Sequence, residues 1–245
     1  MKKGVFILKI LAIHTSSTNC SVCLLQNNTV VQELHRTNEK THSQQLMPLI
    51  NQLLTQFHLE LSDIDLFACD IGPGSFTGVR IGVSTMQAFI DVTHKKVVGV
   101  SSLQGLAYNV LDSQASQNVQ YICSLIDAKN DNVYFGLFKK EQNGILQNLE
   151  DLSCQNIHDV ITLLSEKYGN KKIYFVGDGA TSHRYAILEN LDKTEFVAES
   201  LNIQSSMNIG KIAYYLYQEN PNIEYPLHPL YLRKSQAERA LDGEK

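Results

Sequence analysis

Two stretches of the chain share one pattern of apolar strands and polar turns. Residues 10–26 can be placed over residues 123–139 without a gap, and each copy gives an apolar strand, a polar turn and a second apolar strand. A turn signal and a third apolar strand follow in each copy, at residues 29–34 and 145–149. The repeat predicts two copies of a three-stranded meander.

The elements after each meander repeat as well. In the first half the apolar periodicity predicts a helix at 42–57, a strand at 66–70, a helix at 76–91, a strand at 97–100 and a helix from 102. In the second half it predicts a helix at 157–168, a strand at 173–176, a helix from 182, a strand at 195–198 and a helix at 204–218. Strands that alternate with helices indicate parallel pairing. We therefore predict an α/β protein with two βββαβαβα-like lobes, which is the duplicated actin-like fold of sugar kinases and Hsp70.

A polar stretch rich in Ser, Gln and Asn, at residues 112–118, separates the two copies. The 245 residues are enough for two lobes of ordinary size. We predict a first actin-like lobe at 1–114, which carries a glycine-rich turn and two partner helices. A second, shorter actin-like lobe is predicted at 115–245 and ends in a C-terminal tail.

Composition narrows the class of protein. A hydrophobic content of 43% fits a globular chain, and the formal net charge of −4 argues against a broad surface for nucleic acid. The five cysteines show neither a disulfide framework nor zinc spacing. Lys9 interrupts the apolar run at 1–13, which we interpret as a buried strand rather than a signal peptide. Because no apolar stretch reaches the roughly 20 residues that span a bilayer, we expect a cytoplasmic protein with no membrane contact.

The first two helices carry more apolar surface than one sheet can cover. In the first of them, Met47 and Leu54 form a second ridge beside the main apolar face. In the second, Gly78 and Gly82 form a smooth strip that another backbone can approach. Two interpretations stay open: the helices pack on the sheet and on each other, or they form a subunit interface. The predicted interface residues are Met47, Leu54, Gly78 and Gly82.

A glycine-rich turn joins a predicted strand to the second of these helices. The free amides and the dipole at a helix start can bind an anion. The spacing matches neither the dinucleotide motif nor a phosphate loop with its lysine, so a tight structural turn is favoured. The alternative is an anion cradle formed by Gly72, Gly74, Ser75 and Thr77.

The string GPGSFTGVRIG at residues 72–82 resembles the signature of the TsaB family. Further matches to that family lie at residues 42–48, 99–103, 127–128, 133–134 and 231–233, so the resemblance covers nearly the whole chain. It implies an inactive relative of the TsaD-type catalytic subunit, which pairs with that subunit and with a TsaE-type ATPase. Together these proteins transfer threonylcarbamoyl to the tRNA adenosine next to the anticodon. The resemblance also implies a homodimer in isolation and contact with tRNA only through the complex.

Several residues argue against an enzyme. In the catalytic relative, two histidines four residues apart hold a metal, and the corresponding positions here are Ser102 and Leu106. Leucine cannot ligate a metal, and none of the eight histidines lies three to five residues from another. His14 stands where the family usually has an aspartate, which in actin-like kinases helps to hold metal and phosphate. We expect no catalytic residue, no metal, no cofactor and little or no ATP binding.

Two other functions are considered as alternatives. An active small-molecule kinase of the same fold needs an acid on the phosphate hairpin, a role open to Asp127 but not to His14. A peptidase needs a nucleophile elbow or a metal pair, and the sequence contains neither G-x-S-x-G nor H-E-x-x-H. Both alternatives are less well supported than a partner subunit.

Overall fold

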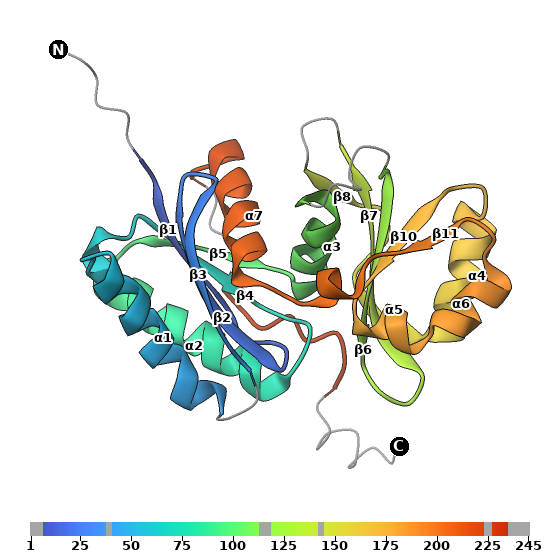
Figure 1. The fold of residues 1–245 in the computed structure, drawn as a ribbon, viewed down its shortest axis with the longest axis horizontal. Coiled ribbons are helices and arrows are strands. Elements are labelled where there is room, and N and C mark those ends of the chain that lie inside the picture. Colours follow the sequence, from blue (N-terminus) through green and yellow to red (C-terminus); the bar gives the residue numbers. More distant parts are fainter. Residues whose placement is uncertain (1–6, 38–40, 113–118, 142–144, 223–226, 235–245) are drawn as a thin grey trace. The chain divides into compact units, whose positions relative to one another are not determined.

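The computed structural model describes residues 7–37, 41–112, 119–141, 145–222 and 227–234. Within this part of the chain there are two compact units (Figure 1). Unit 1 has the bounds Met1–Gly105 and Gln204–Pro229, and unit 2 has the bounds Leu106–Ile203 and Leu230–Lys245. Each unit has its own sheet and its own apolar core.

Unit 1 contains a five-stranded sheet in the order β3-β2-β1-β4-β5. Its strands are β1 Lys9–His14, β2 Asn19–Gln26, β3 Thr29–Thr37, β4 Leu66–Asp70 and β5 Lys96–Val100. The first three pair antiparallel as the predicted meander, whereas β1, β4 and β5 pair parallel. The helices of the unit are α1 His42–Gln56, α2 Phe76–Thr93, the start of α3 Ser102–Asp112, and α7 Ser206–Glu219.

Helices cover both faces of the unit 1 sheet, with α1 and α2 on one face and α7 on the other (Figure 1). Leu11 and Ile13 of β1 belong to the core cluster formed with α1 and α2, whereas Ala12 faces α7. A Cβ atom on Gly210 of α7 would lie 3.2 Å from the Ala12 Cβ and 2.3 Å from Leu25 Cδ1. Gly210 therefore allows α7 to lie close against the sheet, and the strand is buried on both sides.

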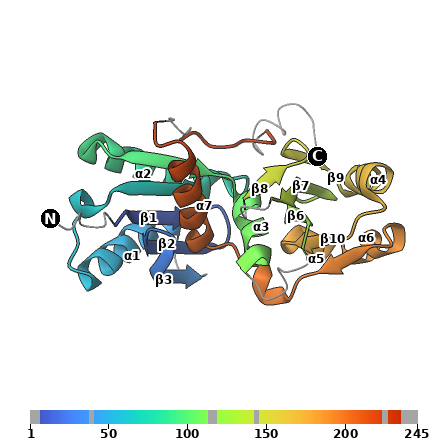
Figure 2. The same cartoon turned by 90° about the horizontal axis from the view of Figure 1, so that it is seen from above.

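Unit 2 contains a sheet in the order β11-β10-β6-β7-β8, with β9 paired to β7. Its strands are β6 Tyr121–Asp127, β7 Asn132–Lys140, β8 Leu146–Asn148, β9 Ser153–Asn156, β10 Ile173–Val176 and β11 Thr194–Phe196. Its helices include α4 Ile157–Tyr168, α5 Asp178–Ser182 and α6 Arg184–Asn190. The sheet separates α4 and α6 from the part of α3 that belongs to this unit (Figure 1, Figure 2).

The two sheets have the same topology, which confirms the predicted duplication. Strands β1 to β5 correspond in order and direction to β6, β7, β8, β10 and β11. The hairpins differ by one residue in register, because Ile10 pairs with Leu25 whereas Cys123 pairs with Leu137. The last pair of the first hairpin, His14 with Ser21, encloses six residues, whereas that of the second, Asp127 with Val133, encloses five. In the second turn, Lys129, Asn130 and Asp131 all have positive φ.

Two differences from the predicted elements have local causes. The helix expected from residue 182 begins at Arg184 as α6, and an additional short helix, α5, starts earlier, after β10 and Gly177. Gly177 (φ 110°) makes this early start possible, because a Cβ there would lie 2.1 Å from the Leu125 carbonyl oxygen. Strand β9 was not predicted because its four residues carry no period-two apolar pattern.

The unit bounds differ from the predicted lobes at 1–114 and 115–245, since α7 lies in unit 1. Its apolar face packs against β1, β2, β4 and β5. The order of elements along the chain does not reveal which sheet a late helix covers. Most of the expected boundary, residues 113–118, lies outside the described residues.

Glu33 of β3 holds the start of α7. Its Oε1 atom accepts hydrogen bonds from Ser205 Oγ (2.7 Å), Ser206 Oγ (2.8 Å) and the Met207 amide (3.0 Å), and its Oε2 atom lies 3.3 Å from His35 Nε2. Burial alone would raise the pKa of Glu33, but hydrogen bonds from His35, Ser205 and Ser206 lower it to about 2. The carboxylate also complements the positive end of the helix dipole.

We expect Glu33→Gln to lower the free energy of unfolding by about 1–2 kcal/mol at pH 7, because the neutral amide loses the charge-assisted bonds. The folded-state pKa lies below the ordinary 4.5, so the carboxylate stabilises the fold above that pH. This contribution is lost as the pH falls toward 2. Urea unfolding followed by circular dichroism at several pH values measures the difference.

The exposed Glu199 of unit 2 supplies a matched control, since Glu199→Gln should leave stability within about 0.5 kcal/mol of the wild type. A Glu33→Gln protein as stable as the wild type at pH 7 would contradict the assigned role. A stability difference that does not shrink in acid would contradict it too.

Candidate functional site

The carboxyl ends of the parallel strands in unit 1 meet the starts of two helices. His14 ends β1, Asp70 ends β4 and Ser102 begins α3. Ligands of open α/β sheets bind at this edge. This end of the sheet is therefore the candidate functional site of unit 1.

A buried His14–Asp70 pair occupies the centre of this site. His14 Nδ1 lies 2.5 Å from Asp70 Oδ2, and the side chains are 1% and 0% exposed. Asp70 Oδ1 accepts hydrogen bonds from Ser102 Oγ (2.5 Å) and from the Gly72 amide (2.9 Å). Burial alone would raise the pKa of Asp70, but the His14 charge and hydrogen bonds from His14, Ser102 and Ser16 lower it. The carboxylate is thus held by groups of its own unit.

The network continues into the β1–β2 turn and the segment before α7. Ser16 Oγ lies 2.9 Å from Ser102 Oγ and donates a hydrogen bond to Gln204 Oε1 (3.1 Å). Asn19 Nδ2 donates to the Gln204 carbonyl (3.0 Å), and His14 Nε2 lies 2.8 Å from Ser17 Oγ. We call the connected set His14, Ser16, Asp70, Ser102 and Gln204 the polar network. Its members bond one another, so a ligand would have to displace them.

The glycine-rich turn packs closely against this network. Gly72 has φ 94°, and a Cβ atom on Gly74 would lie 2.3 Å from the Ser16 carbonyl oxygen. The Ser75 amide donates to that same oxygen (2.7 Å), and the Gly78 amide donates to Ser75 Oγ (3.2 Å). Since these amides already have acceptors within the chain, the geometry fits a tight structural turn.

The predicted anion cradle remains a prediction. The structure brings its four residues together on one turn, with Gly72 buried and Ser75 and Thr77 exposed. The amides of Gly72 and Ser75 are engaged, by Asp70 Oδ1 and by the Ser16 carbonyl respectively. An anion would have to compete with both.

The structure corrects the geometry expected for the partner interface. A Cβ atom on Gly78 would lie 2.0 Å from the Thr15 carbonyl oxygen, and one on Gly82 would lie 2.5 Å from Thr15 Oγ1. Both glycines are buried and face Thr15, so they form no exposed strip. Leu54 is only 7% exposed and belongs to the core, whereas Met47 is 48% exposed. Glycine on a helix signals close approach, and here the approaching backbone belongs to the same unit.

In unit 2, Asp127 stands at the position equivalent to His14. Its Oδ1 accepts a hydrogen bond from the Lys129 amide (2.8 Å), and its Oδ2 lies 2.5 Å from Lys129 Nζ. Burial alone would raise the pKa of Asp127, but the hydrogen bonds and charge of Lys129 lower it. On the same hairpin, Arg233 donates a hydrogen bond to the Ala128 carbonyl oxygen.

Ser102 and Leu106, which correspond to the expected metal histidines of the catalytic relative, make other contacts here. Ser102 bonds Asp70 in the polar network, and the Leu106 side chain is buried. Among the described residues, no three His, Cys, Asp or Glu side chains come together as a metal site. A search of the same residues finds no helix with the length and apolar character needed to cross a membrane.

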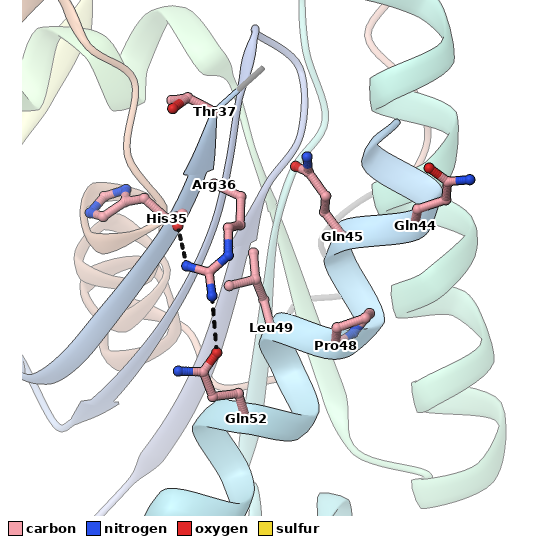
Figure 3. Close-up of a pocket in the computed structure, with 8 residues that line it drawn as sticks. All are labelled: His35, Arg36, Thr37, Gln44, Gln45, Pro48, Leu49 and Gln52. Carbon is pink, nitrogen blue, oxygen red and sulfur yellow. Dashed lines mark hydrogen bonds between the residues drawn. The ribbon is translucent and has the colours of Figure 1, made fainter. Parts of the chain in front are cut away.

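A groove beside the edge strand was not anticipated from the sequence. It lies between β3 and the first half of α1 and has a volume of about 440 Å³ (Figure 3). Its lining residues are His35, Arg36, Thr37, Gln44, Gln45, Pro48, Leu49 and Gln52. Two features of the sequence could have indicated it. Glutamines recur along the first predicted helix, at 44, 45 and 52, and an arginine, Arg36, lies shortly before that helix.

A family model and two curated relatives place this chain among proteins of tRNA threonylcarbamoyladenosine biosynthesis. The family model described as TsaD, tRNA N6-adenosine threonylcarbamoyltransferase, matches residues 27–241. The tRNA threonylcarbamoyladenosine biosynthesis protein TsaB of Bacillus subtilis is 29% identical over 94% of this chain and 96% of its own length. The TsaB protein of Escherichia coli is 31% identical over 66% of this chain and 69% of its own length.

Solved structures show the same fold. A Pseudomonas aeruginosa protein described as similar to the peptidase YeaZ superposes with a TM-score of 0.76 at 24% identity, over 92% of this chain and 100% of that one. A Listeria monocytogenes protein whose name proposes an N-acetylmannosamine kinase gives a TM-score of 0.53 at 12% identity, over 87% and 100%. The actin-like fold predicted from the repeat is therefore confirmed, and the chain belongs to the TsaB family.

Proposed function

We propose that this chain acts in tRNA threonylcarbamoyladenosine biosynthesis as a non-catalytic subunit that pairs with a TsaD-type catalytic subunit. The observation that carries this proposal is the closed polar network at the ligand edge of unit 1. The relatives from Bacillus subtilis and Escherichia coli, both named for this biosynthesis, support the pathway.

The polar network supports the absence of catalysis. A kinase of this fold needs a carboxylate that is free to hold metal and phosphate at the end of β1. Here that position is His14, and the neighbouring Asp70 already has His14, Ser102 and the Gly72 amide as partners. The equivalent acid in unit 2, Asp127, is paired with Lys129. Both carboxylates therefore have partners within the chain, and neither is free to hold metal and phosphate.

The proposed partners follow from the family and from charge. Besides the TsaD-type subunit, we propose a TsaE-type ATPase as a partner, a homodimer in isolation, and a cytoplasmic location where tRNA is modified. The net charge of −4 supports contact with tRNA only through the complex, because phosphate contacts require basic surface.

We place the proposed partner surface on the outward face of α1 and α2. Met47 of α1 is the member of the predicted set that is exposed, and Arg80, Ser84 and Gln87 of α2 are exposed as well. A catalytic relative with the same lobe can use the same face, so heterodimer and homodimer would be mutually exclusive. Adding the partner should then dissolve the homodimer.

The two alternative functions have less support. The Listeria protein shares only the fold with this chain, at 12% identity, and carries no argument for kinase activity here. The word peptidase in the description of the Pseudomonas structure belongs to that protein. Incubation with ATP and candidate sugars, and separately with casein, distinguishes both alternatives from a partner subunit.

We expect the isolated protein to bind ATP weakly or not at all, because the end of β1 carries His14 instead of an acid and the equivalent Asp127 is paired with Lys129. Isothermal titration calorimetry with Mg-ATP measures this directly. A dissociation constant in the micromolar range for the isolated protein would contradict this expectation.

We expect Asp70→Asn to lower the free energy of unfolding by about 3 kcal/mol or more, because a buried pair loses one charged partner. Asp192→Asn, at an exposed position of unit 2, is the matched control and should change stability by no more than about 0.5 kcal/mol. Denaturant unfolding compares them. If Asp70→Asn were fully stable but failed to support threonylcarbamoyl transfer in the reconstituted complex, the carboxylate would be functional rather than structural.

We expect Met47→Glu to fold normally but to lose both homodimer and heterodimer, because a charge buried at an interface without a partner costs roughly 2–5 kcal/mol. Leu54→Glu should instead unfold unit 1, since Leu54 is core. Leu188→Glu on α6 is the matched control, because Leu188 is also 48% exposed. Sedimentation velocity with and without the TsaD-type subunit, together with circular dichroism, gives the result, and normal pairing of Met47→Glu would refute this surface.

A further inference from the structure

The proposed function makes no use of the groove between β3 and α1. Strand β3 is the last strand of the unit 1 sheet on its side. Alternate backbone N–H and C=O groups of such an edge strand point away from the sheet and can pair with another chain. The groove runs beside this edge, over the apolar side chains of Pro48 and Leu49 (Figure 3).

The edge is covered by its own side chains. Gln32 Nε2 donates a hydrogen bond to the Glu33 carbonyl (2.9 Å), and Arg36 Nη1 donates to the His35 carbonyl (2.9 Å). Arg36 Nη2 also reaches across the groove to Gln52 Oε1 on α1 (3.3 Å) (Figure 3). These contacts protect the edge from unspecific strand pairing, and Arg36 acts as a latch between strand and helix.

The acceptors of the Arg36 guanidinium are neutral oxygens. The hydrogen bonds of Arg36 given above go to a carbonyl and a side-chain amide, and none of the eight lining residues is acidic. A guanidinium forms its strongest bonds with a carboxylate, through two parallel hydrogen bonds. A carboxylate that entered the groove would therefore displace the His35 and Gln52 oxygens.

The start of α1 adds to the positive character of the groove. Its first turn has no acidic residue, and Thr41 makes no side-chain cap. Within the first turn of α1, no acidic side chain offsets the partial positive charge of the helix end. Gln44, Gln52 and Thr37 add neutral hydrogen-bond donors along the walls. The groove is thus a positive feature on a chain whose net charge is −4.

We propose that this groove binds an extended, acidic segment of a partner protein. One carboxylate of the segment replaces the His35 carbonyl and Gln52 Oε1 as the acceptor of the Arg36 guanidinium. The backbone of the segment lies along the edge of β3. This binding mode adds a strand to a sheet, with specificity from a side-chain pocket. It is independent of the outward face of α1 and α2 and of the pairing proposed above.

The probe is a fluorescent peptide of alternating valine and glutamate, about eight residues long to match a strand. The control peptide carries lysine in place of glutamate. Fluorescence anisotropy with the full-length protein should show saturable binding of the glutamate peptide and at least tenfold weaker binding of the lysine peptide, roughly the factor expected for one charge-assisted contact. The affinity should fall as salt is added.

Three variants test the latch. Arg36→Gln should weaken binding of the glutamate peptide about tenfold or more, since it keeps donors but loses the charge. Arg36→Lys should give an intermediate affinity, because it keeps the charge but loses the planar fork. Arg184→Gln, at an exposed arginine of unit 2, should bind like the wild type. Amide NMR shifts should localise the peptide to β3 and the first half of α1.

Several results would overturn the proposal. These are equal binding of the two peptides, wild-type affinity in Arg36→Gln, an equal loss in Arg184→Gln, and no binding at millimolar peptide.

Discussion

The buried carboxylate of Asp70 is the constraint on which unit 1 depends. A charge at 0% exposure is tolerated only when donors surround it, because water no longer solvates it. The donors come from the end of β1, from the glycine-rich turn and from the first residue of α3. Through Ser16 the same network reaches Gln204, just before α7. Pieces of chain far apart in sequence must therefore come together before this charge is satisfied.

This constraint changes what the edge of the sheet can do. In an α/β fold the carboxyl ends of the strands usually present groups to a ligand. In unit 1 the same positions hold one another, and the glycine-rich turn packs on Ser16 with its amides already engaged. A site whose members bond each other contributes rigidity to the lobe. The proposed role as a partner subunit relies on such a rigid lobe, since binding surfaces on rigid elements lose less entropy on association.

Much of the fold was accessible from the sequence, and the failures have common causes. Strands β4 and β10 and helix α4 have the predicted bounds, because apolar runs there end at clear turn signals. The repeat predicted two similar lobes that each begin with a three-stranded meander, and the two sheets agree with it. The glycines at 78 and 82 were placed on the wrong side of α2, because a small residue indicates close approach without naming the neighbour. The polar network and the groove depend on contacts between distant segments, such as His14 with Asp70 and Arg36 with Gln52, which periodicity does not report.

The position of α7 near the end of the chain sets the order in which the lobes can mature during translation. Residues 106–203, which supply most of unit 2, leave the ribosome before α7 does. For roughly 5–20 s at ordinary elongation rates, the face of the unit 1 sheet around Ala12 and Leu25 has no helix to cover it. Unit 2 can complete most of its core in that interval, whereas unit 1 stays an open two-layer intermediate with an apolar face. The lobe whose synthesis starts first is therefore the lobe whose core is completed last.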